Sequence, residues 1–346
     1  MKLIEVPRPR SHIRMPSIGY GGRFTVELID AQTKLVKRHL EFDNLITNVG
    51  LDSLLDNSIY PHKVTGDSFS EQILFCAVGT NSTAPAATQT TLGAEIAPAV
   101  DNRTKSNGAI PPGTVTYVAG SPDYWYRRGT WLFGTAQGNG NLTEIGLFTA
   151  SSGGTMFTRQ LLKDGGGTPT TVVKTSAEEL RVTYEFRCRP AQADVTGTVT
   201  LDGVSYDYTV RPCDVDNANN FSWGGYISSG DFWNNSSANH ASCYETQTLS
   251  AREGTGPSGS ASACSSCAPS AYSAGTYYRD YTAIWQSGVG NFGLGVGSVT
   301  FLAPANTGSH ASTWQISFAA TTGGARIPKT NTKRLTLVFR HSVARV

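Results

Sequence analysis

The chain is poor in charge. Of its 346 residues only 16% are Asp, Glu, Lys or Arg, and 28 basic residues nearly balance 26 acidic ones, which leaves a net charge of +2. An ordinary soluble domain carries about 25% charged residues, and a dedicated nucleic-acid binder shows a strong basic excess. We therefore expect no nucleic-acid partner.

Long apolar runs and a dense set of cysteines are also missing. No run of about 18 apolar residues occurs, so we expect no membrane insertion through a helix. Residues 1–7 lack the apolar core of a secretory signal, which favours synthesis and assembly in a reducing cytoplasm. Six cysteines in 346 residues are too sparse for a scaffold built from disulfides.

The residues that replace charge favour strands and turns. The chain has 37 Gly, many Ser and Thr, 39% hydrophobic residues and 10% aromatic residues. Thr, Tyr and Phe favour strands, whereas Gly, Ser and Asn favour turns. This composition predicts an all-β protein with enough apolar side chains for a core and with long polar loops.

Local patterns predict hairpins and one short helix. Residues 23–41 alternate around a turn at 30–33, and Asp202-Gly203 is a strong two-residue hairpin signal within residues 197–208. The helix is expected near residues 48–56, with Asn48 as its N-cap and Leu51 and Leu54 on one face. Short strands without intervening helices indicate β-sandwich-like domains or barrels.

The chain divides into three parts by composition. We expect a basic N-terminal arm at residues 1–23, a first β-domain at 24–192, and a second β-domain at 193–346 with Ser/Gly/Asn-rich loops over 214–275. The arm is either a solvated segment or a segment that docks on a partner subunit. At the other end, a closing strand should bury one face through Leu335, Leu337 and Phe339.

One pattern occurs twice. Lys174-Thr175 precedes an alternating strand that begins near Leu180, and Lys329-Thr330, offset by 155 residues, precedes the strand that begins near Leu335. The pattern is either a coincidence between two strands or the sign of two related sandwiches that the same strand closes.

Four residues have the spacing of metal ligands. His240-x-x-Cys243 and Cys264-x-x-Cys267 are compatible with a tetrahedral zinc site. A disulfide and incidental free thiols are the alternatives. Because the surrounding sequence is of low complexity, we predict no bound metal and no cofactor.

Other motifs are weaker. Residues 288–293 match GxGxxG, but a strand-like segment follows where a dinucleotide site needs a helix. Asp214-x-Asp216 opens like a calcium loop without its later Gly and Glu, and Cys76 lies in an expected strand, where a buried thiol is more frequent than a nucleophile. With neither a GxSxG nor an HExxH motif, the chain is not expected to be an enzyme, and no catalytic, cofactor-binding or metal residue is assigned.

Aromatic residues form two clusters. Such clusters fill a core or a subunit interface, where Tyr, Trp and Arg are enriched, or they stack on the sugar rings of a surface glycan. We favour the interface. The clusters are Tyr124, Trp125, Tyr126, Arg127, Arg128 and Trp131, and then Trp223, Tyr226, Phe232 and Trp233.

Several segments resemble tail-associated structural proteins of tailed bacteriophages. They lie within residues 40–190 and 280–346 and include FDNLITNVGLD at 42–52, FCAVGT at 75–80, EIGLF at 144–148, GTMF at 154–157, the stretch 174–186 and the stretch 327–340. The resemblance implies a virion component in the tail tip, baseplate or tail fibre. It offers no functional site to carry over.

The resemblance also implies partners and a location. We expect a homo-oligomer, with a homotrimer favoured, that contacts other tail proteins, is located in the virion tail and has a role in host attachment. The alternatives are a receptor-binding adhesin that recognises host surface polysaccharide and a head-decoration or collar protein.

Overall fold

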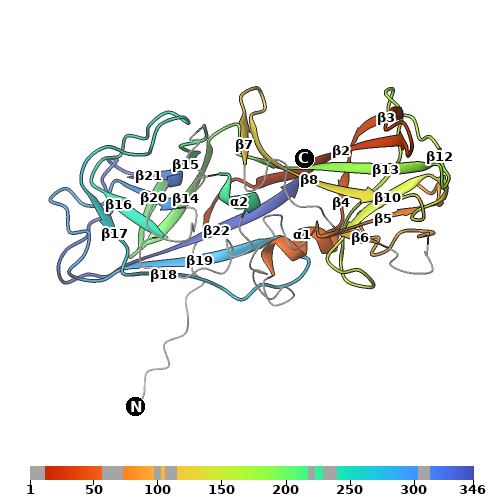
Figure 1. The fold of residues 1–346 in the computed structure, drawn as a ribbon. Coiled ribbons are helices and arrows are strands. Elements are labelled where there is room, and N and C mark those ends of the chain that lie inside the picture. The colour runs from red at the N-terminus through yellow and green to blue at the C-terminus, as the bar shows by residue number, and fades with distance from the viewer. Residues whose placement is uncertain are drawn as a thin grey trace, which may run out of the picture.

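The protein is built almost entirely of strands (Figure 1). The computed structural model describes residues 12–56, 73–96, 103–105, 115–216, 223–228, 240–302 and 312–346. Within these ranges there are 22 strands and two short helices. The predicted all-β class with sandwich-like units is confirmed. No helix of the described ranges is long and apolar enough to cross a membrane.

The first half of the chain supplies most of its strands to two sheets. In chain order its elements are β1 (Ile13–Arg14), β2 (Ile18–Asp30), β3 (Val36–Asp43), β4 (Leu45–Ile46), α1 (Asn48–Leu55), β5 (Phe75–Gly79), β6 (Thr104–Lys105), β7 (Thr116–Val118), β8 (Tyr124–Phe133), β9 (Gly140–Leu142), β10 (Glu144–Phe148), β11 (Met156–Leu161), β12 (Val172–Lys174) and β13 (Glu178–Arg189).

In the described ranges the second half has nine strands and one helix. They are β14 (Val195–Leu201), β15 (Val204–Pro212), α2 (Gly225–Ser228), β16 (Ala241–Tyr244), β17 (Ala261–Ala263), β18 (Ser266–Pro269), β19 (Tyr278–Trp285), β20 (Ser298–Leu302), β21 (Ser312–Ala320) and β22 (Leu335–Arg345).

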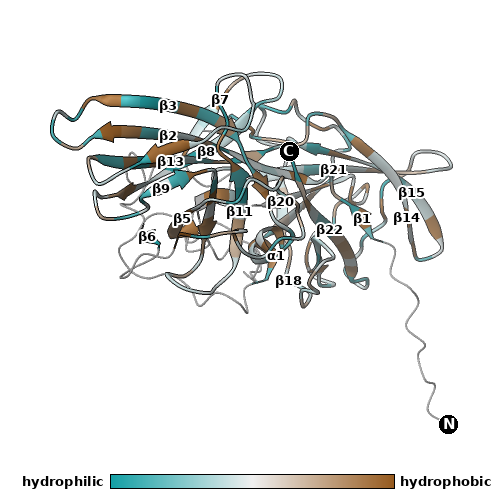
Figure 2. Cartoon of the chain, turned by 90° about the vertical axis from the view of Figure 1, so that its right-hand side faces the viewer, coloured by the Kyte–Doolittle hydropathy of each residue, from teal (hydrophilic) through white to brown (hydrophobic). Residues whose placement is uncertain are grey.

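In the first half, two sheets pack face to face. One contains β3, β2, β13, β8 and β7, and the other has the order β4-β11-β10-β5-β6. Phe157 of β11 meets Phe186 of β13 edge to face, with ring centroids 5.4 Å apart. Alternating hydrophobic and hydrophilic residues along β2, β3 and β13 are visible in Figure 2, as expected for strands with one buried face.

The second half repeats this arrangement. Its strands β18, β19 and β22 face a sheet with the order β14-β15-β21-β20-β16-β17. Phe301 of β20 packs between Tyr281 of β19 and Phe339 of β22, with ring centroids 5.4 and 5.7 Å away.

The two halves have the same strand order. The order β4-β11-β10-β5-β6 corresponds strand by strand to β15-β21-β20-β16-β17, and β7-β8-β13 corresponds to β18-β19-β22. The small β9–β12 pair, with Leu142 opposite Val172, corresponds to the isolated bridge between Val296 and Ile327. This shared topology favours a related pair of sandwiches over coincidence.

The repeated lysines hold equivalent loops. Lys174 Nζ donates to the Gly134 carbonyl (2.9 Å) and to Asn139 Oδ1 (2.8 Å). Lys329 Nζ donates to the Gln286 carbonyl (2.8 Å) and to an Asn291 Oδ1 at the same distance. In each half the carbonyl belongs to the residue just after β8 or β19. Both lysines are buried, so each ties the loop that follows one strand to the start of the closing strand.

The halves are joined through β22. The end of this strand pairs in parallel with the start of β2, with Ile18 opposite Val343. This pairing unites strands from both halves in one nine-stranded sheet. The Arg345 guanidinium also donates to the Ile46 carbonyl and to Asn48 Oδ1, beside the start of α1. The expected boundary at residues 190–194 lies between β13 and β14.

Several local predictions are confirmed. The hairpin at 23–41 is formed by β2 and β3, and Asp202 and Gly203, with φ of 48° and 81°, make the turn between β14 and β15. Leu335, Leu337 and Phe339 are buried in β22.

The helix is confirmed but its cap differs. α1 begins at Asn48, yet Thr47 is the N-cap, because its Oγ1 accepts the Gly50 N–H at 3.0 Å. The Asn48 Oδ1 atom instead accepts a hydrogen bond from the Arg345 guanidinium.

Two segments are more ordered than expected. Residues 12–23 are not a solvated arm, because Ile13, Ile18 and Tyr20 are fully buried in β1 and β2. Residues 1–11 lie outside the described residues. The region 214–275 is not only loop, since it contains α2, β16, β17 and β18.

Candidate interaction surface

The four candidate metal ligands lie in the second half without forming one cluster. His240, Cys243, Cys264 and Cys267 are all buried, and no group of three or more His, Cys, Asp or Glu residues suited to a metal ion occurs within the described ranges. Cys243 Sγ faces the Ser262 carbonyl at 3.5 Å.

Cys264 and Cys267 interact with each other. A hydrogen bond between their side chains lowers the pKa of Cys264 and raises that of Cys267. Burial raises the pKa of Cys243 to about 12. All three are present as free cysteines. A thiolate is the nucleophilic and metal-binding form, so Cys243 and Cys267 are held in the less reactive form.

The remaining motifs have structural positions. Cys76 is fully buried in β5, and burial raises its pKa well above the ordinary value. The glycine-rich residues 288–293 follow β19 and contain Asn291, which accepts the Lys329 hydrogen bond. Asp214 is buried and its backbone N–H donates to the Gly254 carbonyl. None of these motifs is placed as a substrate site.

Most of the aromatic residues fill the core. Trp125 and Trp131 are buried, and their indole N–H groups donate to the carbonyls of Val215 and Leu74 at 2.7 and 2.9 Å. In the second cluster Trp223 and Tyr226 are buried, whereas Phe232 and Trp233 lie outside the described residues. Trp125 and Trp131 therefore belong to the core, as one of the alternatives predicted. Their buried rings do not contact a subunit interface or a glycan in this fold.

The exposed remainder of the first cluster belongs to a charged surface. Tyr124 and Tyr126 of β8 are half-buried and Arg128 is exposed. The Arg128 guanidinium lies 4.7 Å from the centre of the Tyr126 ring, and the Arg187 guanidinium lies the same distance from the Tyr124 ring.

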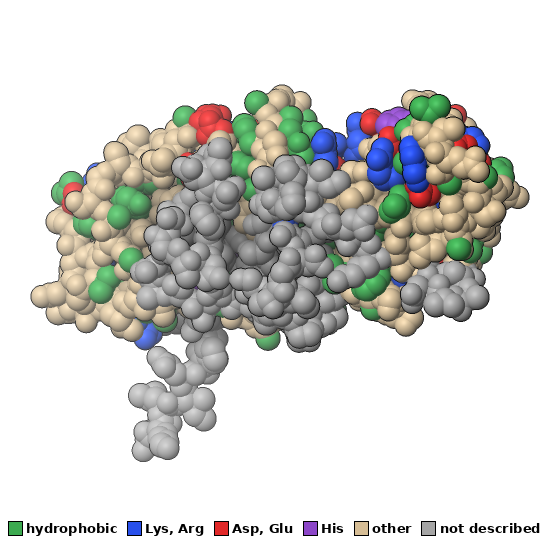
Figure 3. Space-filling view, in the orientation of Figure 1, with side chains coloured by type: hydrophobic (Ala, Val, Ile, Leu, Met, Phe, Trp, Pro, Cys, Tyr) green, Lys and Arg blue, Asp and Glu red, His purple; other side chains and the backbone are tan. Residues whose placement is uncertain are grey.

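This surface, which we call the charged face, is the outer side of β3, β2, β13 and β8. In the space-filling view, Lys, Arg, Asp, Glu and His side chains gather over the end of the molecule that holds β2 and β3 (Figure 3). Its members are Arg23, Glu27, Lys34, Lys37, His39, Glu41, Asp43, Tyr124, Tyr126, Arg128, Glu178, Glu179, Arg181, Glu185 and Arg187.

Ion pairs cross from strand to strand over the charged face. Arg181 of β13 contacts Glu27 of β2 at 2.7 Å, and Glu185 of β13 accepts from Arg128 of β8 at the same distance. The hydrogen bond from Arg181 lowers the pKa of Glu27. Exposed pairs of this kind contribute little to stability, about 0–1 kcal/mol each, so their concentration on one face of a charge-poor chain needs another explanation.

Sequence reasoning missed this surface although the signal was present. In β3, Lys37, His39, Glu41 and Asp43 occupy every second position, and β13 repeats the pattern. Because alternate residues of a strand share one face, such spacing predicts a charged sheet face. The aromatic residues of β8 do not indicate this face, because the neighbouring Trp125 and Trp131 are buried.

Comparisons of the chain with models of known protein families, with curated proteins and with solved structures found no match.

Proposed function

We propose that the chain is a structural component of a bacteriophage virion, located in the tail tip, baseplate or fibre. Four of the six segments that carry the resemblance lie together in the fold, and this observation supports the proposal most; the stretches 174–186 and 327–340 belong to β13 and β22 of another sheet. The four segments supply β4, β11, β10 and β5, which are four neighbouring strands of one sheet, together with α1.

The charged face supports a role in assembly. Tyr and Arg side chains are enriched at protein interfaces, and the half-buried Tyr124 and Tyr126 and the exposed Arg128 lie on this face. In the proposal, this surface contacts a neighbouring tail protein or another copy of the chain, and the chain forms a homo-oligomer with a trimer favoured.

Imaging tests the location. Particles of the virus that encodes this chain are labelled with an antibody against it and viewed by electron microscopy. We expect label on the tail. Label on the head or collar supports a decoration or collar protein instead, and absence of the chain from purified particles by mass spectrometry contradicts any structural role.

Native mass spectrometry tests the oligomer. At micromolar concentration we expect a trimer that Arg128→Glu weakens, because the charge reversal disturbs the charged face. Lys163→Glu, which alters a half-buried lysine outside this face, is the matched control. A monomer in all three samples, together with absence from particles, contradicts the proposal.

The adhesin remains the second candidate. It requires exposed aromatic rings in the second half, and Trp223 and Tyr226 are buried. Binding of the isolated protein to host cells or to purified surface polysaccharide would favour the adhesin over a connector within the tail.

A further inference from the structure

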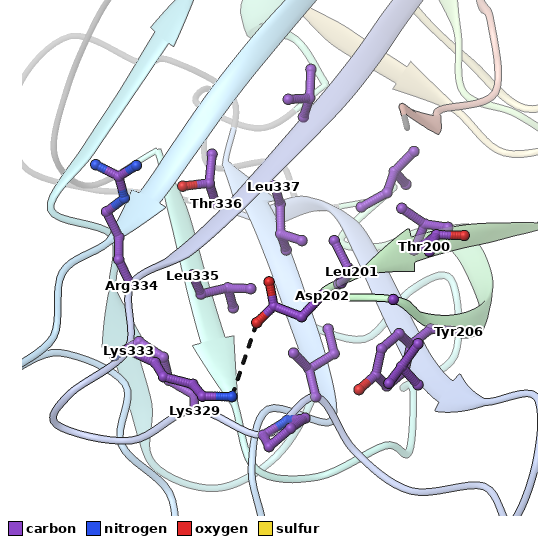
Figure 4. Close-up of a pocket in the computed structure, with 17 residues that line it drawn as sticks. Thr200, Leu201, Asp202, Tyr206, Lys329, Lys333, Arg334, Leu335, Thr336 and Leu337 are labelled. Atoms are coloured by element: carbon purple, nitrogen blue, oxygen red, sulfur yellow. Dashed lines mark ion pairs between the residues drawn. The ribbon is translucent and has the colours of Figure 1, made fainter. Parts of the chain in front are cut away.

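The second half contains a groove at the edge of β22. It lies between the β14–β15 hairpin and the beginning of β22 and has a volume of about 640 Å³. Leu335 and Leu337 line it from β22, and Thr200 and Leu201 line it from β14 (Figure 4).

Among the described residues, strand edges without a partner face this groove from both sides. β14 is the end strand of its sheet, and β15 is its partner within the described ranges. On the side of β22 away from β19, the described pairings begin at Phe339, opposite Ile13 of β1. No described strand pairs with residues 335–338 on that side. Unpaired N–H and C=O groups of such edges are a template for another strand.

The direction of these backbone groups follows from the pairing. The Arg340 carbonyl accepts the Met15 N–H on the side of β1, and backbone groups alternate in direction along a strand. Thr336 and Val338 therefore direct theirs toward the groove. In β14, the two-residue turn makes Leu201 bond to β15, so the Thr200 backbone N–H and C=O point away from β15.

The first half shows what fills the corresponding position. There β13 pairs with β2 along its whole length, with Leu180 opposite Leu28 and Val182 opposite Val26. Leu180 and Val182 correspond to Leu335 and Leu337 through the 155-residue offset. Residues 335–338 of β22 thus present an edge suited to an antiparallel strand with apolar side chains at alternate residues, next to the place where β1 already pairs.

The charges at the start of β13 and of its counterpart β22 indicate which charge the added strand carries. At the start of β13, Glu178 and Glu179 bind Lys37 and Lys34 of the β2–β3 hairpin at 2.7 and 3.0 Å. The offset places Lys333 and Arg334 at these two positions, so the sign is reversed.

Both basic residues line the groove. Within the part of the chain that the structure describes, the ion pair of Lys333 is a 4.0 Å contact with Asp202, whose side chain is 89% exposed (Figure 4). The complementary strand is therefore acidic where it passes these residues.

We propose that this groove binds an extended acidic segment of another protein, which adds as a strand between β14 and β22. Main-chain hydrogen bonds supply the affinity and alternate apolar side chains supply the specificity, as in other cases of β-strand addition. The site follows from the geometry of this chain and goes beyond the proposed function, because it applies to any assembly that contains the chain.

A peptide with the sequence of residues 25–31, TVELIDA, is the probe; it stops short of Phe24, because the corresponding position opposite Phe339 is taken by Ile13 of β1. It forms the corresponding strand in the first half and carries Glu27 and Asp30. Labelled with fluorescein and amidated at its C-terminus, it is titrated with the full chain and followed by fluorescence polarisation. We expect saturable binding at micromolar concentrations, and at least tenfold weaker binding to the Lys333→Glu/Arg334→Glu variant.

Two controls separate strand addition from general charge attraction. A peptide with Lys in place of both acidic residues should bind the double variant better than the unchanged chain. Thr200→Pro removes an N–H that faces the groove and should weaken binding. Thr198→Pro, on the same edge but outside the groove lining, should not. Circular dichroism confirms that each variant is folded.

Four results would overturn the proposal. These are no binding of the probe, binding that neither the charge reversal nor Thr200→Pro changes, binding that appears only after deletion of residues 1–11, and an oligomer that the double charge reversal converts to monomer. The third result would assign the groove to the chain's own N-terminal segment, and the fourth would assign it to a second copy.

Discussion

At the scale of single residues, buried polar side chains carry the clearest consequences. His341 of β22 lies among the rings of Phe301, Tyr281 and Trp314, with ring centroids 4.5, 5.3 and 6.3 Å away. Burial lowers its pKa to about 3, and the charge of Asp280 opposes this shift only in part. The histidine is therefore neutral in the folded protein over a wide range of pH.

We predict a loss of stability in mild acid that depends on His341. In the unfolded chain the His341 side chain binds a proton below about pH 6.5, whereas in the folded chain it binds one only below about pH 3. The free energy of unfolding therefore falls as the pH decreases through this range, by about 2–3 kcal/mol between pH 6.5 and 4.5. Urea denaturation at a series of pH values measures it.

His341→Phe should remove this slope, whatever its effect on absolute stability. The carboxylate of Glu178 acts in a separate window, because Lys37 holds its pKa at about 2. Its contribution is complete above about pH 4.5 and is lost only as the pH falls toward 2. An unchanged slope between pH 6.5 and 4.5 in the variant would show that His341 is not the group responsible.

The two buried lysines support a second prediction. Lys174→Met leaves the Gly134 carbonyl without this donor, and Lys329→Met does the same to the Gln286 carbonyl. Each change should lower the free energy of unfolding by about 1–3 kcal/mol. Because the sites lie in different halves, the double variant should lose about the sum.

Urea denaturation of the single and double variants measures these losses, with Lys163→Met as the control on a half-buried lysine. If both lysine variants match the control, then the lysines do not hold their loops as the geometry indicates.

At the scale of elements, local sequence predicted α1 well but misassigned its cap. Asn and Thr both cap helices, and the choice between residues 47 and 48 depends on what the Asn48 side chain meets. Arg345, almost 300 residues away in sequence, occupies it. Nothing within the local sequence of the helix contains that information.

We predict that the Thr47 hydroxyl stabilises α1. Thr47→Ala should lower the free energy of unfolding by about 1 kcal/mol, with a further loss because Oγ1 also donates to the Met156 carbonyl at 2.5 Å. Thr47→Ser keeps the hydroxyl and should lose less. Thermal and urea denaturation compare the two variants, and equal losses would contradict a capping role.

At the scale of the whole molecule, β22 links the two sandwiches. It pairs with β19 on one edge and with β1 and the beginning of β2 on the other. The first half keeps its own closing strand, β13, between β2 and β8. The halves therefore depend on β22 to different degrees.

Truncation before Ile327 should unfold the second half and leave the first half folded. Burial of Leu335, Leu337 and Phe339 contributes about 1.5–3 kcal/mol for each side chain, against about 5–15 kcal/mol for a whole domain. Limited proteolysis should leave a protected fragment that ends near residue 190. Continued protection of residues 195–326 would show that this half does not need its closing strand.

The sequence by itself determined the strand-rich class, the hairpin at Asp202-Gly203, the short helix, and the buried face of Leu335, Leu337 and Phe339. These features follow from alternation and turn chemistry, which act over a few residues. The matched Lys174 and Lys329 also indicated a relation between the halves, although they did not establish it.

Only the tertiary structure decided which distant segments meet. It placed Ile13 and Tyr20 in the core rather than in an arm, directed Trp125 and Trp131 inward, and kept the four candidate metal ligands from forming one cluster. Within the described ranges it also gave residues 335–338 of β22 no partner on the side of β1, whereas the counterpart strand β13 is paired with β2. Pairing between strands far apart in the chain depends on how whole sheets pack. Two strands with the same alternation of apolar and polar residues can therefore pair with different neighbouring strands.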